Sequence, residues 1–203
     1  MMFQAINESG QVYDEWVVYS VGGGALAEEG HSSNQTPDIY ELNHLNDIIK
    51  WCDERGYSYW QFVEECEESD IWDYLNEVWK VMRAAVERGL ETEGVLPGGL
   101  NLRRKAPHYF IKAQGYSANL QTRGLVFAYA LAVTEENASG GRIVTAPTCG
   151  SCGVVPAVLY HIQESRNFST KRILHALATA GLVGNIAKTL ASISGDRKST
   201  RLN

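Results

Sequence analysis

The sequence has few cysteines, few basic residues and no long apolar run, and each shortage excludes a class of protein. Four cysteines among 203 residues are too few for the disulfide framework of a small secreted domain. The 18 basic residues are outnumbered by 24 acidic ones, for a net charge of −6, and form no basic stripe, which argues against nucleic acid or a membrane surface as partner. The opening residues, MMFQAINESG, are too polar for a signal peptide, and the longest apolar run, residues 124–133, is too short to span a bilayer. We therefore expect a cytoplasmic protein whose cysteines are reduced thiols or ligands, with a small-molecule or protein partner.

The hydrophobic pattern predicts a mainly α-helical protein with a short β hairpin at its N-terminus. Hydrophobic residues make up 44% of the chain, which argues against disorder. Two β-rich runs within residues 3–19 flank a short loop that contains Gly10, as in a hairpin. Apolar residues then recur at helical spacing. The predicted helices cover residues 38–56, 59–69, 70–91, 118–138, about 152–164 and about 169–190.

Residue types also predict which of these segments are buried. The helix over residues 118–138 is apolar on most sides and should be largely buried, ending at Gly140 and Gly141. The helix over residues 70–91 should begin after a cap at Ser69 or Asp70. Its predicted core positions are Trp72, Leu75, Val78, Trp79 and Met82. The basic cluster Arg103, Arg104 and Lys105 is interpreted as a solubilising surface rather than an anion site.

The chemically most informative segment is GRIVTAPTCGSCGVVPAVLYH, residues 141–161. A short β-prone run and a turn precede an apolar helix, so Cys149 and Cys152 are predicted to lie where a strand meets a helix. A thiol at a helix N-terminus faces unpaired N–H groups, which favours its thiolate as a nucleophile or metal ligand. A single C-x-x-C is compatible with a redox pair, half a zinc site, iron–sulfur ligation or two small buried residues.

The surrounding sequence weighs against two of these interpretations. Redox function ranks first from the pattern alone, but the flanking chain is predicted as successive helices, without the alternating strands that a thioredoxin-like sheet requires. Zinc is disfavoured because no second cysteine or histidine pair completes a tetrahedral site. The residues by themselves do not decide between the readings that remain.

Three stretches of the chain carry a resemblance to a known family. They are EENASGGRIVTAPTCGSCGVVPAVL at residues 135–159, the following ATAGLVGNIAKTLASISG, and VVYSVGGG near the start. Together they resemble the iron–sulfur-dependent L-serine dehydratases (L-serine ammonia-lyases). Residues 31–113 match only in general helical character, and Leu190 stands where the family usually has asparagine.

The resemblance implies a domain organisation. Residues 1–30 would be the hairpin and SVGGG loop that end an N-terminal α/β domain, and residues 31–115 a helical connection that begins the catalytic domain. Residues 116–195 would be the helical catalytic domain, truncated. The last residues, 196–203 (DRKSTRLN), lack apolar periodicity and look like a translated sequencing adapter, so we expect a non-native tail.

The resemblance also implies site residues. Cys152 would be one ligand of a [4Fe–4S] cluster. Such a cluster needs about three protein thiolates, so its remaining ligands are expected to be missing from this chain. Cys149 stands where many relatives have asparagine, and is either a substrate contact or a spare thiol. Thr148 would lie beside the cluster and contact substrate. Glycine N–H groups can bind an anion, so a loop made of Ser20, Gly22, Gly23 and Gly24 is our candidate for the substrate carboxylate, with a flexible exit from the hairpin as the alternative.

The activity implied is the conversion of L-serine to pyruvate and ammonia by a lyase of amino-acid degradation and gluconeogenesis, without pyridoxal phosphate. We expect the fragment to be inactive alone and the intact enzyme to form a homodimer. No general base is assigned, because none of the 5 histidines lies in a matched motif. Two alternatives stay open: a thiol–disulfide protein that uses Cys149 and Cys152, and a non-enzymatic helical interaction module.

Overall fold

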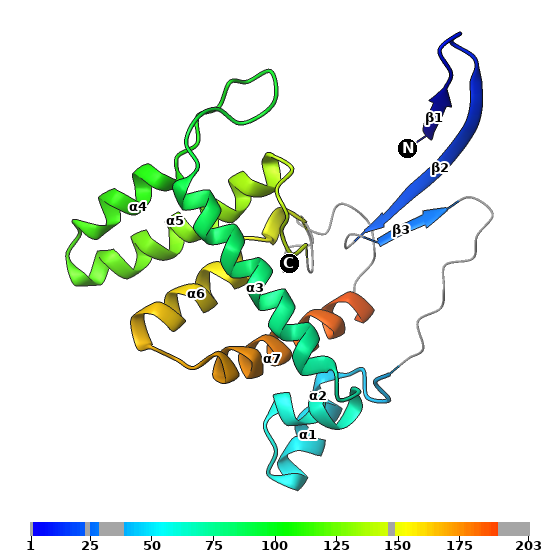
Figure 1. Ribbon diagram of the computed structural model, residues 1–203. Coiled ribbons are helices and arrows are strands. Elements are labelled where there is room, and N and C mark those ends of the chain that lie inside the picture. Colours follow the sequence, from blue (N-terminus) through cyan, green and yellow to red (C-terminus); the bar gives the residue numbers. More distant parts are fainter. Residues whose placement is uncertain (1, 23–24, 29–38, 146–148, 191–203) are drawn as a thin grey trace.

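The computed structural model describes residues 2–22, 25–28, 39–145 and 149–190 (Figure 1). Its strands are β1 (Met2–Ile6), β2 (Val12–Gly22) and β3 (Ala25–Glu28). Its helices are α1 (Leu45–Arg55), α2 (Tyr59–Cys66), α3 (Ile71–Glu91), α4 (Ala106–Gln114), α5 (Ala118–Ala138), the short 3₁₀ helix η1 (Cys149–Ser151), α6 (Val154–Arg166) and α7 (Thr170–Leu190). The predicted mainly α class is confirmed.

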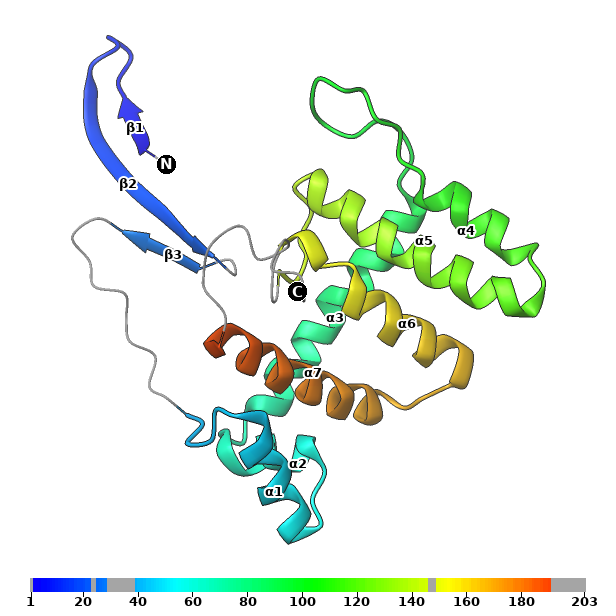
Figure 2. The ribbon, with the colours of Figure 1, turned by 180° about the vertical axis from the view of Figure 1, so that it is seen from behind.

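The strands form an antiparallel sheet in the order β1-β2-β3 that stands beside the helical body (Figures 1 and 2). The predicted hairpin is present: Phe3 pairs with Trp16, and Gly10 has a φ of 83° in the connecting turn. However, β2 is longer than predicted and gains a second partner, because Ser20 pairs with Leu26 of β3. The prediction missed β3, because no β-rich run follows the glycines.

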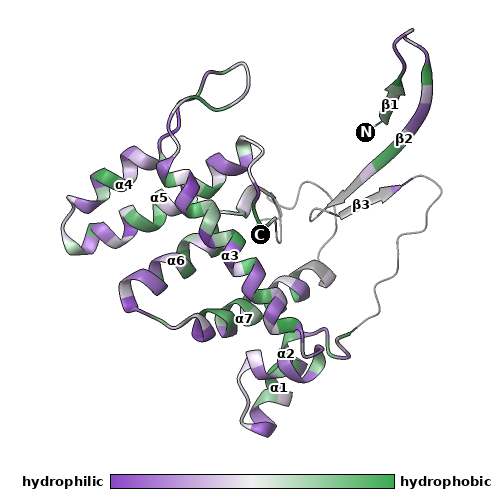
Figure 3. Cartoon of the chain, in the orientation of Figure 1, coloured by the Kyte–Doolittle hydropathy of each residue, from purple (hydrophilic) through white to green (hydrophobic). Residues whose placement is uncertain are grey.

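In the helical body α3 is the central element, and α5, α6, α7 and α4 all pack against it (Figures 1 and 2). One core cluster joins α1, α2, the first half of α3 and α7, with Ile48, Trp79 and Ile173 among its buried members. A second cluster joins the other half of α3 with α5 and α6. Figure 3 shows hydrophobic and hydrophilic residues on every helix, as expected when one side of each helix packs inward.

The first helix differs from prediction at its start and the second at its end. α1 ends as predicted, with Gly56 in the left-handed region at a φ of 67°, but it begins at Leu45 rather than near residue 38. The segment before it is irregular yet anchored, because Tyr40 packs on the first cluster and its hydroxyl donates to Glu67 Oε1 at 2.5 Å. α2 ends at Cys66, three residues earlier than predicted. Tertiary contacts thus replace the helical turn that the apolar spacing suggested.

Predictions for α3 and α5 were correct in extent and partly wrong in burial. Leu75, Trp79 and Met82 are buried in the core, as predicted, whereas Trp72 and Val78 are half-buried. α5 has the predicted bounds, but it is not buried on most sides, since Phe127 is 52% exposed. Among the described helices, none is long and apolar enough to cross a bilayer.

A close contact between α3 and α5 depends on a glycine, and it leads to a first prediction. A Cβ at Gly89 of α3 would lie 2.4 Å from the backbone oxygen of Ala132 in α5. Gly89→Ala should therefore force the helices apart and lower the free energy of unfolding by about 1–3 kcal/mol, despite the better helix propensity of alanine.

The matched control is Gly184→Ala in α7, where an added Cβ meets nothing within 4 Å. This variant should be neutral or more stable by up to about 1 kcal/mol. Urea unfolding followed by circular dichroism measures both. Equal stability of the two variants would show that α3 and α5 do not pack as described.

Candidate functional site

The segment that carries the predicted site runs from the end of α5 to the start of α6. α5 ends at Ala138, and Gly140 follows in the left-handed region with a φ of 75°. The residues up to Thr145 form no regular secondary structure, so the β-prone run was wrongly predicted as a strand. A strand needs a neighbour to pair with, and this run lies against helices instead. Side-chain contacts with those helices hold it in place.

The first of these contacts is a buried ion pair. The carboxylate of Glu136 in α5 accepts a hydrogen bond from Nη1 of Arg104 at 3.0 Å and another from Nε of Arg88 at 3.0 Å. The side chains of Glu136 and Arg104 are only 8% and 7% exposed. Arg104 also donates to Ser139 Oγ at 2.6 Å. The interpretation of Arg104 as a solubilising surface residue was therefore wrong, because its charge is buried and paired with Glu136.

The neighbouring carboxylate, Glu135, is buried and caps another helix. Its Oε1 accepts from the backbone N–H of Lys105 at 2.7 Å, and its Oε2 from that of Ala106 at 3.3 Å. These two N–H groups lie at the start of α4, where no intrahelical acceptor is available. The sequence prediction missed α4, because its capping group comes from α5. Two adjacent acids near the end of an otherwise apolar helix were the available signal for both roles.

Two glycines let this segment approach α5 closely. A Cβ at Gly141 would lie 2.7 Å from Oε2 of Glu136. A Cβ at Gly153 would lie 2.4 Å from the backbone oxygen of Ala130. Only glycine fits at these distances, so the backbone on both sides of the cysteines rests directly on α5.

Cys152 lies one residue before Gly153, the N-cap of α6, as the sequence predicted. It is 2% exposed and belongs to the second core cluster together with Val86, Tyr129 and Val133. Cys149 is the first residue of η1. The enclosed thiol of Cys152 reaches an external disulfide partner only if the segment opens, which disfavours the thiol–disulfide alternative.

The described residues do not form a complete iron–sulfur site. Nowhere in the described ranges are three or more histidine, cysteine or acidic side chains grouped so that they could hold a metal ion. Cys52 and Cys66 belong to the first core cluster, apart from Cys152. Burial raises the pKa of both thiols, and the nearby carboxylates of Asp53 and Glu67, respectively, raise it further. Both thiols therefore favour the protonated form near neutral pH.

The other predicted site residues are only partly described. Ser20 and Gly22 are paired residues of β2, with Gly22 opposite Ala25, so the prediction that they form an open loop was wrong. The pairing partner that fixes them, β3, was not recognisable in the sequence. Gly23, Gly24 and Thr148 lie outside the described residues. Ser20 and Gly22 thus belong to the sheet, whereas Cys149 and Cys152 belong to the helical body.

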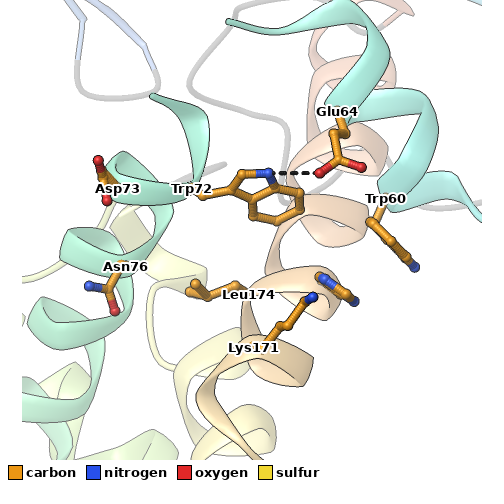
Figure 4. A pocket seen from close by; sticks show the side chains of 8 residues that line it. Trp60, Glu64, Trp72, Asp73, Asn76, Lys171 and Leu174 are labelled. Carbon is orange, nitrogen blue, oxygen red and sulfur yellow. Dashed lines mark hydrogen bonds between the residues drawn. The ribbon is translucent and has the colours of Figure 1, made fainter. Parts of the chain in front are cut away.

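A separate groove lies between α2, α3 and α7 and has a volume of about 580 Å³ (Figure 4). His175 stacks on Trp60 with ring centroids 3.7 Å apart. Trp72 donates its indole N–H to Glu64 Oε1 at 3.0 Å (Figure 4). Burial lowers the pKa of His175, and Lys171 lowers it further against the opposing effect of Glu64. No residue predicted to bind substrate or metal lines this groove.

Residues 11–198 match the sequence profile of the family described as serine dehydratase alpha chain. The chain belongs to this family. It is 35% identical over 210 residues to the L-serine dehydratase of Haemophilus influenzae, and 36% identical over 209 residues to L-serine dehydratase 1 of Escherichia coli; each alignment covers 96% of this chain and 46% of the relative. L-serine dehydratase TdcG of Escherichia coli is 38% identical over 191 residues, which cover 87% of this chain and 42% of the relative. The chain thus spans about half the length of the curated relatives that it matches.

The buried ion pair gives a second prediction. Glu136→Ala leaves the enclosed guanidinium of Arg104 without its carboxylate, and this should lower the free energy of unfolding by about 3–5 kcal/mol. The control is Glu87→Ala, which removes the exposed partner of Arg83 on α3 and should cost less than about 1 kcal/mol. Denaturant unfolding compares the two. A loss at Glu136 as small as that at Glu87 would contradict the buried pair.

His175, which stacks on Trp60, gives a third prediction. Because the pKa of folded His175 lies below its ordinary value of about 6.5, the unfolded chain binds the proton more readily. The contribution of neutral His175 to the free energy of unfolding should therefore be fully present above about pH 6.5 and fall as the pH drops below it. His175→Phe keeps a ring on Trp60 and should weaken this dependence, leaving the part due to His161, whose pKa burial also lowers. Unchanged pH dependence of the unfolding midpoint in this variant would exclude the assigned role.

Proposed function

We propose that this chain forms part of an L-serine dehydratase, a lyase that converts L-serine to pyruvate and ammonia. The observation that carries the proposal is the similarity, at 35% to 38% identity, to relatives named L-serine dehydratase over 87% to 96% of the chain. The reaction belongs to the intact enzyme, for which we propose a homodimer, a cytoplasmic location and a role in amino-acid degradation and gluconeogenesis. We propose that this chain by itself is inactive.

The proposed cofactor is a [4Fe–4S] cluster with Cys152 as one ligand, and not pyridoxal phosphate. The position of Cys152 supports this: it immediately precedes the N-cap of α6, and its backbone neighbour Gly153 is pressed against α5. The other thiolates must come from outside the described residues, which offer one candidate ligand rather than a set. A metal ion with an open position supplies Lewis-acid chemistry, which suits an elimination whose leaving group is a poor one.

For substrate we propose two contributions. Thr148 and Cys149 precede Cys152 by four and three residues in the sequence, and their backbone and side-chain groups would face the L-serine that approaches the cluster. The end of β2, with Ser20 and Gly22, together with Gly23 and Gly24, would supply N–H groups for the substrate carboxylate. Because Ser20 and Gly22 are held in the sheet, this contribution would come from a hairpin end rather than from a free loop.

The test is a substitution at the proposed ligand. The test protein is full-length, containing this chain and the remaining length found in its relatives, and it is purified without oxygen. In this protein Cys152→Ser should abolish both iron binding and pyruvate formation from L-serine. Removing one of about three cluster thiolates leaves the cofactor unsupported. Iron analysis, visible absorbance and a pyruvate assay measure the outcome.

The matched control is Cys66→Ser, which changes a half-buried thiol of the other core cluster. It should keep its iron and its activity. A Cys152→Ser protein with full iron content would refute the ligand assignment, and an iron-loaded wild-type protein that forms no pyruvate from L-serine would refute the proposed reaction.

A further inference from the structure

The side chain of Arg88 joins two parts of the site at once. It extends from α3 and donates through Nε to Oε2 of Glu136, while Nη2 donates to the backbone carbonyl of Arg142 at 2.8 Å. The first contact ties Arg88 to the buried ion pair between Arg104, which precedes α4, and Glu136 of α5. The second ties it to the irregular segment that leads to the cysteines. The planar guanidinium presents several donors in a fixed fork, which is what two acceptors in different directions require.

The residue after this tethered carbonyl enters the core around the cysteine. Ile143 packs against the second core cluster, whose buried members include Cys152, Val86 and Val133. The next residue, Val144, packs against the first cluster. A segment without regular secondary structure has few backbone hydrogen bonds of its own, and the hydrogen bond from Arg88 to the Arg142 carbonyl fixes the backbone next to Ile143.

On the other side of the cysteine the chain is fixed independently. Gly153 rests on the backbone oxygen of Ala130, which also accepts from the hydroxyl of Thr134 at 2.8 Å. Cys152 is therefore held on its C-terminal side by direct contact with α5. On the N-terminal side, Ile143 packs against the core cluster that contains Cys152. There the hydrogen bond from Arg88 to the Arg142 carbonyl adds to the contact of Gly141 with Glu136 of α5.

We propose that Arg88 is a positioning residue for Cys152: through the Arg142 carbonyl it seats Ile143 in the core that holds the thiol. The part of this proposal that concerns metal binding rests on the proposed function, because it takes Cys152 to be a ligand. The part that concerns the enclosure of Cys152 does not.

The experiment compares two arginines of the same helix. Arg88→Met removes the tether and leaves the pair between Arg104 and Glu136 in place. Arg83→Met is the matched control, because Arg83 is 46% exposed against 44% for Arg88 and also binds a carboxylate, that of Glu87. Alkylation of the cysteines in the iron-free chain by iodoacetamide is followed by peptide mass spectrometry, with the rate at Cys152 divided by that at Cys52.

Cys52 is 3% exposed against 2% for Cys152 but lies in the other core cluster, so it reports on global opening. The Cys152-to-Cys52 ratio should rise about tenfold in Arg88→Met, as expected when one charge-assisted hydrogen bond is lost locally, and stay unchanged in Arg83→Met. Arg88→Lys, which can meet one acceptor but not both, should lie between. A ratio unchanged in Arg88→Met, or raised equally in Arg83→Met, would overturn the proposal.

A second measurement addresses the metal. In the intact protein, Arg88→Met should release iron to a chelator at least about tenfold faster than Arg83→Met, as outer-shell substitutions commonly do. Equal release rates would overturn the positioning of a ligand. A wild-type protein that binds no iron would instead refute the proposed function, and the alkylation ratio would still test the enclosure of Cys152.

Discussion

The rest of the site depends on the pairing of the Glu136 carboxylate with Arg88 and Arg104. The carboxylate is enclosed by protein and receives two guanidinium groups, one from α3 and one from the residues before α4. A buried charge is tolerated only when it is paired and hydrogen-bonded, so this carboxylate determines where Arg88 and Arg104 must lie. Because Arg88 also donates to the Arg142 carbonyl, the Glu136 carboxylate connects α3, α5 and the residues before α4 to the segment that carries the cysteines.

Close backbone contact completes this arrangement. Gly89 and Gly153 lie against backbone oxygens of α5, and Gly141 lies against the carboxylate of Glu136. At each of these distances an added Cβ would clash. The helices around α5 therefore form a rigid support, and the turn before α6 is pressed onto it. Such a support suits a ligand that must be held in one place, since the groups behind a ligand orient it.

Family membership and structure together define what this chain contributes. It matches the serine dehydratase alpha chain over residues 11–198, yet it spans about half the length of its curated relatives. In its described part it offers one enclosed thiol beside a helix start and no group of metal ligands. We therefore regard it as the scaffold and one ligand of a proposed site that other residues complete.

The sequence alone was sufficient for the mainly α class, the hairpin, the bounds of α5 and the place of Cys152 before α6, because these follow from apolar periodicity, turn residues and a specific motif. Tertiary structure decided β3, α4, the late start of α1 and the irregular path after Gly141. Each depends on a partner distant in the sequence: β3 on β2, α4 on the Glu135 cap, Tyr40 on Glu67, and Arg142 on Arg88. Local pattern cannot reveal such contacts, because they exist only once the helices have packed.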